Sequence, residues 1–145
     1  MGHPSSASSS VSSPPGALEL DVIVPGSLDR PTGGDRYDAR MVAGLRDRGW
    51  RISVHGLDGD FPRLDAASRH ALDSVLGEIQ DDSRVLVDGL ILGGLPDPVR
   101  RHTRRLRILA LVHHPLADET GRSDDVRKEL LRSEGRALEA AVGVI

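Results

Sequence analysis

The chain has 145 residues, a net charge of −3 at pH 7, 2% aromatic residues and no cysteine. This length suits one domain with an aliphatic core, the weakly acidic balance gives no general attraction to nucleic acid, and disulfides and thiolate metal sites are excluded. No apolar run approaches the roughly 20 residues of a membrane span, so we expect a cytoplasmic protein that binds no nucleic acid and has no transmembrane segment.

The first segments of the chain are a leader, a strand and a helix. Residues 1–16 are rich in Ser and Pro and lack the pattern of a secretion signal, which predicts a disordered leader. The apolar stretch Ala17–Val24 is typical of a buried strand. Thr32 can cap the next helix, with Asp35 reaching back as in a capping box. Apolar residues then recur at helical spacing until Gly49 ends the helix.

The remaining pattern alternates strands with helices. Amphipathic helices are predicted from Leu64 to Ile79 and after Ser123, which can cap the second one, and a short helical stretch is broken near Pro96 and Pro98. The strand runs are apolar on both faces, as in a parallel sheet covered by helices. We therefore predict an α/β, doubly wound, Rossmann-like domain over residues 17–145. Four further strands are expected, at Trp50–Gly56, Arg84–Leu90, Leu106–His114 and Val142–Ile145.

Two loops are the strongest candidates for a site. In a doubly wound sheet, ligands bind beyond the carboxyl ends of the strands, where the strand order reverses. If the order is 3-2-1-4-5, the loop carrying Thr32, Gly33 and Gly34 faces the loop carrying His113 and His114. The glycines then either let a phosphate or sugar approach a helix N-terminus or form a turn with positive φ. Neither the dinucleotide fingerprint nor a P-loop is present.

Other polar residues follow the ends of the third and fourth strands. His113 and His114 can orient a hydroxyl or act as a general base near neutral pH, or simply bond to the backbone. A metal site formed with Asp118 and Glu119 is conceivable, but the spacing matches no known signature, and we expect no metal. Asp88 can bind a sugar hydroxyl or cap the helix that follows it. Glu119 can contact a polyol or belong to a solvated loop.

A basic run precedes the fourth strand. It could hold a phosphate-bearing acceptor or contact an anionic lipid surface. We favour a solvated helix end, where positive charge suits the helix dipole. The run contains Arg100, Arg101, Arg104, Arg105 and Arg107.

Several segments together resemble the N-terminal domain of GT-B glycosyltransferases, in the large retaining group (group 4-like) that uses nucleotide sugars. They are TGG before a helix, Tyr then MVAGLRDRG, WRISV in the second strand, LVDGLILGGLP, and LALVHHPLADETG. The resemblance covers about residues 18–145. The family typically has a histidine ending this strand, often as V-H-D, which aligns with His113. His114 stands where aspartate is frequent, and this departure concerns the acceptor chemistry.

The resemblance implies a two-domain enzyme that transfers a sugar from a nucleoside-diphosphate sugar to an acceptor, without metal or cofactor. This chain would be the acceptor-side domain, and a second Rossmann-like domain would bind the donor. It implies that Gly33 and Gly34 lie near the donor diphosphate or the acceptor and that His113, the catalytic candidate, lies near the reacting sugar. The substrate-binding candidates are Thr32, Gly33, Gly34, Tyr37, Asp88, His114 and Glu119.

The apolar end of the sequence bears on its activity, and two other functions remain open. Domain termini normally lie on exposed polar segments, whereas this sequence ends within an apolar strand, so we expect the parent protein to continue. The chain alone would then be inactive. One alternative is a non-catalytic interaction module of Rossmann-like or flavodoxin-like shape. Another is an NAD-dependent oxidoreductase in which Asp58 reaches a ribose, although the missing fingerprint weighs against it.

Overall fold

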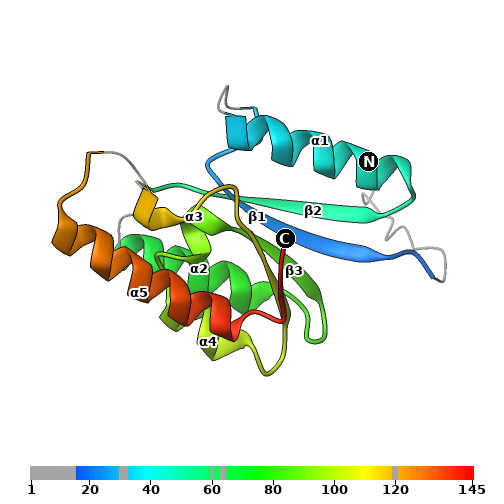
Figure 1. Cartoon of the computed structure of the whole chain (residues 1–145). Coiled ribbons are helices and arrows are strands. Elements are labelled where there is room, and N and C mark those ends of the chain that lie inside the picture. The colour runs from blue at the N-terminus through cyan, green and yellow to red at the C-terminus, as the bar shows by residue number, and fades with distance from the viewer. Residues whose placement is uncertain (1–15, 30–32, 60, 63–64, 119–120) are drawn as a thin grey trace, which may run out of the picture.

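A five-stranded, wholly parallel sheet forms the centre of the protein (Figure 1). The computed structural model describes residues 16–29, 33–59, 61–62, 65–118 and 121–145. The predicted doubly wound, Rossmann-like α/β class is confirmed. The strands are β1 (Glu19–Pro25), β2 (Arg51–Leu57), β3 (Arg84–Asp88), β4 (Arg107–Leu111) and β5 (Gly143–Val144).

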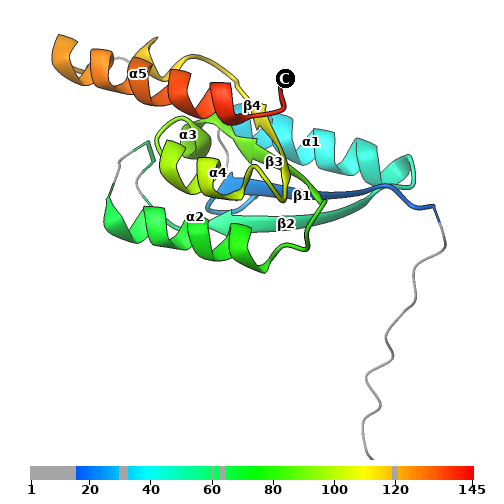
Figure 2. The same ribbon diagram turned by 90° about the horizontal axis from the view of Figure 1, so that it is seen from below.

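Helices cover both faces of the sheet. One face carries α1, while α2, α4 and α5 pack on the other, as two views at right angles show (Figures 1 and 2). The expected leader (apart from Gly16), Thr32, Leu64 and Glu119 lie outside the described residues. The helices are α1 (Gly33–Asp47), α2 (Ala66–Glu78), α3 (Gly89–Leu92), α4 (Pro96–His102) and α5 (Asp124–Ala140), with a 3-10 turn η1 (Leu116–Asp118).

The assumed strand order is wrong. The sheet has the order β2-β1-β3-β4-β5, so β3 and not β4 lies beside β1. After β2 the chain crosses back past β1 instead of extending the sheet outward. The order therefore reverses at β1, between its neighbours β2 and β3. Both arrangements can be built from right-handed crossovers, so apolar patterning alone does not distinguish them.

Alternation along β1 explains why this strand is apolar on both faces. Val22 and Val24 pack with Val42 of α1, and each is 1% exposed. Ile23 points to the opposite face, into the cluster that contains Leu72 of α2, and both are fully buried. Successive side chains of a strand point to opposite faces, so each of these apolar residues has its own layer to fill.

Strands β3 and β4 end earlier than predicted. The side chain of Asp88 accepts a hydrogen bond from the backbone N–H of Leu90 at 2.8 Å, and this bond turns the chain into α3 instead of prolonging β3. A Cβ on Gly89 would lie 3.0 Å from the carbonyl oxygen of Leu111. The two strand ends therefore approach each other closely, and His113 lies beyond the end of β4.

The caps of the two long helices of the second layer only partly match the prediction. Asp65 caps α2 by accepting a hydrogen bond from the N–H of Ser68 at 2.7 Å, which the sequence reading did not identify. Ser123 occupies the predicted N-cap position of α5, but its side chain makes no capping hydrogen bond. The position of a helix start was therefore easier to predict than the bond that stabilises it.

Two arginines of the basic run join α2 to the segment after α4. Arg105 donates to the carbonyl oxygens of Leu76 and Ile79, the latter at 2.8 Å, near the end of α2. Arg101 lies 3.3 Å from the carboxylate of Asp73. These contacts give two of the five arginines partners within the fold, and Arg105, whose side chain is 27% exposed, is not the solvated helix end that was expected. None of the helices in the described part of the chain combines the length and hydropathy of a membrane crossing.

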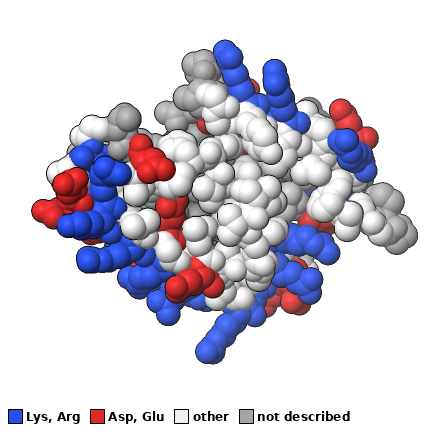
Figure 3. All heavy atoms as spheres, viewed as in Figure 1, with Lys and Arg blue, Asp and Glu red and all other residues white. Residues whose placement is uncertain are grey.

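The α1 face of the sheet is only partly covered by helix. The C-terminal end lies between α1 and α5 (Figure 1), and Val142, Val144 and Ile145 there are 64%, 55% and 61% exposed. Seen from the same side, uncharged residues fill the middle of the surface, and Lys and Arg lie mostly at its margin (Figure 3). The charged side chains therefore leave an uncharged surface beside α1.

Two glycine-to-alanine substitutions should change stability in opposite directions. A Cβ on Gly56 in β2 would lie 1.8 Å from the backbone oxygen of Gly26, so Gly56→Ala should lower the free energy of unfolding by about 3 kcal/mol. Gly77 in α2 faces open space, and Gly77→Ala should raise that free energy by about 0.5–1 kcal/mol. Urea unfolding measures both, and equal stabilities would contradict this packing.

Candidate functional site

A pocket of about 460 Å³ opens at the carboxyl end of the sheet, where the starts of α1 and α3 and the segment after β4 meet. It lies beside the point of strand reversal, the usual ligand position in such sheets. The start of α1 and the segment after β4 thus share a cleft although β1 and β4 are not neighbours. Its lining includes Gly33, Gly34, Asp35, Asp88, His113 and His114.

The glycine pair begins α1 and does not form a left-handed turn. Neither Gly33 nor Gly34 has a positive φ, so the turn alternative is contradicted. A Cβ on Gly34 would lie 3.4 Å from Cδ2 of His113, an ordinary van der Waals contact. A Cβ on Gly33 would meet no atom of the described residues within 4 Å, its chain neighbours left aside. The backbone at Gly33 is therefore open to the approach of a ligand.

Both histidines line the pocket, because β4 ends at Leu111 and the strict alternation of a strand no longer applies to them. Tyr37 does not line this pocket but holds the ring of His113 edge-to-face, with ring centroids 5.4 Å apart. The predicted candidates Gly33, Gly34, Asp88, His113 and His114 thus share one cavity, and Tyr37 supports it.

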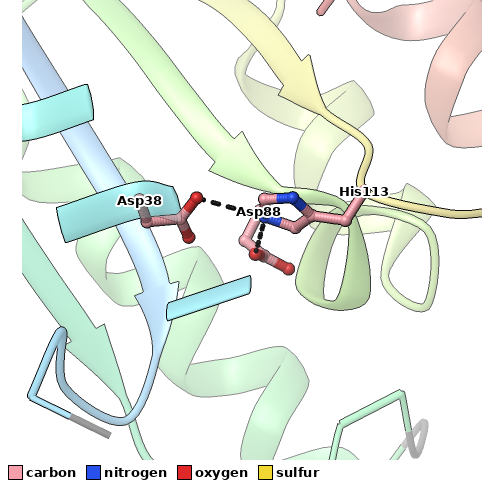
Figure 4. A group of neighbouring side chains, drawn as sticks. All are labelled: Asp38, Asp88 and His113. Atoms are coloured by element: carbon pink, nitrogen blue, oxygen red, sulfur yellow. Dashed lines mark ion pairs between the residues drawn. The ribbon is translucent and has the colours of Figure 1, made fainter. Parts of the chain in front are cut away.

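A buried carboxylate that the sequence reading missed, Asp38 of α1, contacts the candidate catalytic residue. Its Oδ1 lies 3.1 Å from Nε2 of His113, and Oδ2 of Asp88 lies 3.5 Å from the same nitrogen (Figure 4). Asp38 is fully buried, although its helix begins at the pocket. Its spacing of four residues before Val42 puts both on the inward face of α1, which is the signal that the sequence contained.

Burial dominates the electrostatics of this cluster. It raises the pKa of Asp38 to about 6, the charge of Asp88 acts in the same direction, and His113 opposes both. Burial also raises the pKa of Asp88, against the N–H of Leu90 and the charge of His113. Neither Asp38 oxygen accepts a well-formed hydrogen bond from the described residues, although His113 is at ion-pair distance. A buried polar group without a hydrogen bond lowers the free energy of unfolding by about 1–3 kcal/mol.

The arrangement can move a proton or hold a cation. Because Nε2 of His113 faces two carboxylates, it is the nitrogen expected to carry a proton, which leaves Nδ1 to exchange one. Among the described residues, Asp38, Asp88 and His113 are the group whose ligand atoms all lie within 4.8 Å of one another. The set considered from sequence is different, because His114 and Asp118 do not belong to this group and Glu119 is not described.

Asp88 combines the two roles that the sequence left open. One carboxylate oxygen caps α3 through the N–H of Leu90, and the other faces His113. The capping role is therefore confirmed, whereas contact with a sugar hydroxyl stays a prediction. Comparisons of the chain with protein-family models, with curated proteins and with solved structures found no match.

The raised pKa of Asp38 predicts a pH-dependent stability. Between its unfolded value of 3.8 and about 6, the folded protein holds a proton that the unfolded chain has released. The resulting stabilisation is complete below 3.8 and is lost as pH rises through about 6. Asparagine does not titrate, so the stability of Asp38→Asn lacks this pH dependence. Its free energy of unfolding minus that of wild type should therefore rise by up to about 3 kcal/mol as the pH increases from 4 to 7.

Urea unfolding of both proteins across this pH range, in metal-free buffer, measures the difference. The value at each pH also contains the lost contact with His113, so the informative quantity is the change of the difference with pH. A difference that stays constant would show that Asp38 ionises equally in the folded and unfolded chain.

Proposed function

We propose that the chain is the acceptor-side domain of a retaining GT-B glycosyltransferase, which transfers a sugar from a nucleoside-diphosphate sugar. The observation that carries the proposal is that Gly33, Gly34 and His113 line one pocket. These residues come from the two segments that resemble the glycosyltransferases. Their meeting at the carboxyl end of a parallel sheet supports a ligand site there.

The local chemistry supports an anionic, hydroxyl-rich ligand. The 15-residue helix α1 begins at the pocket, so its first N–H groups and its dipole favour a diphosphate oxygen. The open space over Gly33 allows close contact with the backbone. His113 would lie near the sugar, held by Asp38 and Tyr37, and can donate to or accept from a hydroxyl. Amides and cationic groups would stabilise the leaving diphosphate.

The substitution Gly33→Ala tests this role with no new close contact to the part of the chain that the structure describes. Beyond its chain neighbours, the added methyl group meets no atom of the described residues within 4 Å, so a ligand near the backbone would contact it. The nucleotide site belongs to the second domain, so the quantity tested is the domain's own contact with the diphosphate of a nucleoside-diphosphate sugar. Loss of one hydrogen bond to a charged group, about 1.5–3 kcal/mol, should weaken that contact at least about tenfold. Calorimetry measures the affinity, and Gly135→Ala, also in open space but on α5, is the matched control.

NMR shift mapping with the same compounds locates the ligand. Shifts concentrated at Gly33, Gly34 and His113 would support the proposal. If nucleotides, nucleotide sugars and free sugars all leave these residues unchanged, the domain is better explained as a non-catalytic interaction module. The exposed apolar residues at the end of the sheet, Val142 and Val144, give that alternative a candidate contact surface.

The 145 residues alone should show no turnover. By the resemblance, a second Rossmann-like domain supplies the nucleotide site, so the reacting bond is not held in place by this domain alone. Release of nucleoside diphosphate, measured with and without an added acceptor, should stay at the rate of the buffer control. Transfer at ordinary enzymatic rates by these residues would contradict the two-domain mechanism.

An oxidoreductase is less well supported. Asp58, the residue considered for a ribose contact, is exposed after β2 and does not line the pocket. The glycines at the start of α1 do not follow the dinucleotide fingerprint. Tight binding of NAD at this pocket would revive the alternative.

A further inference from the structure

We propose that Asp38, Asp88 and His113 form a binding site for one divalent transition-metal ion, preferentially Zn²⁺. This departs from the expectation of no metal, and it concerns a different group from His113, His114, Asp118 and Glu119. The inference does not rest on the proposed sugar transfer, because metal binding can be measured in the chain itself.

The distances between the donor atoms suit a shared ion. Nε2 of His113 lies 3.1 Å from Oδ1 of Asp38 and 3.5 Å from Oδ2 of Asp88, and the ligand atoms of all three residues lie within 4.8 Å of one another. Zinc ligands lie about 2.0–2.2 Å from the metal, so two of them at a tetrahedral angle are about 3.3 Å apart. Small side-chain rotations would complete the coordination.

The second observation is the condition of Asp38. Both of its oxygens are buried without a hydrogen-bond partner among the described residues, and its side chain is 1% exposed. The carboxylate points toward Asp88 and His113 and not into an apolar layer (Figure 4). As metal ligands, two ionised carboxylates and a neutral imidazole whose Nε2 has released its proton would carry a charge of −2 in a buried place, which a divalent cation neutralises.

The surroundings hold the ligands in place, as in protein metal sites. The N–H of Leu90 fixes one oxygen of Asp88 at 2.8 Å and leaves the other directed at His113. The edge-to-face contact with Tyr37 orients the imidazole ring. Asp88 and His113 also line the pocket, and the side chain of His113 is 24% exposed, so an ion can enter from there. Three protein ligands leave a coordination position for a water or a ligand oxygen.

Other histidine–aspartate pairs of the chain lack these features. His55 lies 2.7 Å from Asp21 across β1 and β2, but both side chains are partly exposed. His102 lies 2.9 Å from Asp73, which also contacts Arg101 at 3.3 Å, a cation that already neutralises the carboxylate. Among the residues that the structure describes, the cluster at His113 is the one in which a histidine lies beside two buried carboxylates.

Isothermal titration of the chelator-treated 145-residue chain with Zn²⁺, Mn²⁺ and Mg²⁺ at neutral pH tests the proposal. One Zn²⁺ should bind per chain, more tightly than Mn²⁺ and far more tightly than Mg²⁺, because an imidazole ligand favours the later metals. Asp38→Asn should weaken Zn²⁺ binding at least about 100-fold. Asp21→Asn, which alters the pair with His55, is the matched control and should leave the affinity unchanged.

A second variant tests the same site independently of Asp38→Asn. His113→Gln alters a partly exposed side chain and should abolish the same binding event while circular dichroism stays native. In wild type, the NMR signals of the His113 ring should change in step with occupancy. Unchanged Zn²⁺ affinity in folded variants would overturn the proposal, and so would Zn²⁺ binding no tighter than that of Mg²⁺. In either case the two carboxylates of Asp38 and Asp88 would be explained by a shared proton and not by a metal ion.

Discussion

The position of β1 between β2 and β3 is the constraint on which the rest of the structure depends. Because the chain goes to one side of β1 and then returns to the other, α1 and α2 lie on opposite faces of the sheet. The loops that leave β1 and β3 therefore diverge and open a pocket at their carboxyl ends. Because β3 lies beside β1, Asp38 in the second turn of α1 meets Asp88 at the end of β3 and His113 after β4.

The cluster of Asp38, Asp88 and His113 lowers the stability of the fold, but its groups are suited to binding a cation or exchanging a proton. A buried carboxylate is costly, and the cost is larger when a second carboxylate lies beside it. The raised pKa values of Asp38 and Asp88 express that cost, and His113 only partly offsets it. Groups held in this way are common where a protein binds a cation or exchanges a proton. The apolar layers on both sides of β1 make the cost tolerable, because they stabilise the fold independently of the cluster.

The candidate site was partly recognisable before the fold was known. Gly33, Gly34 and His113 were identified because glycines before a helix and polar groups after an apolar strand mark the carboxyl ends of parallel strands. Asp38 was not identified, because its neighbours in the chain give no sign that its inward face meets polar groups. Its partner His113 lies far along the sequence. The 3.1 Å between Oδ1 of Asp38 and Nε2 of His113 is reached only when β1, β3 and β4 have paired in one sheet.

Composition and periodicity were sufficient for the class of fold and for most helices and strands, since apolar runs and amphipathic spacing act over short stretches of chain. They also located the glycine pair at a helix start, which local residues alone control. The strand order, the ends of β3 and β4 and the grouping of Asp38 with Asp88 and His113 came from folding. The strand order and the grouping depend on contacts between segments that are far apart in the sequence, such as the pairing of β1 with β3. The end of β3 depends on the capping bond of Asp88, which the apolar pattern of the strand does not reveal.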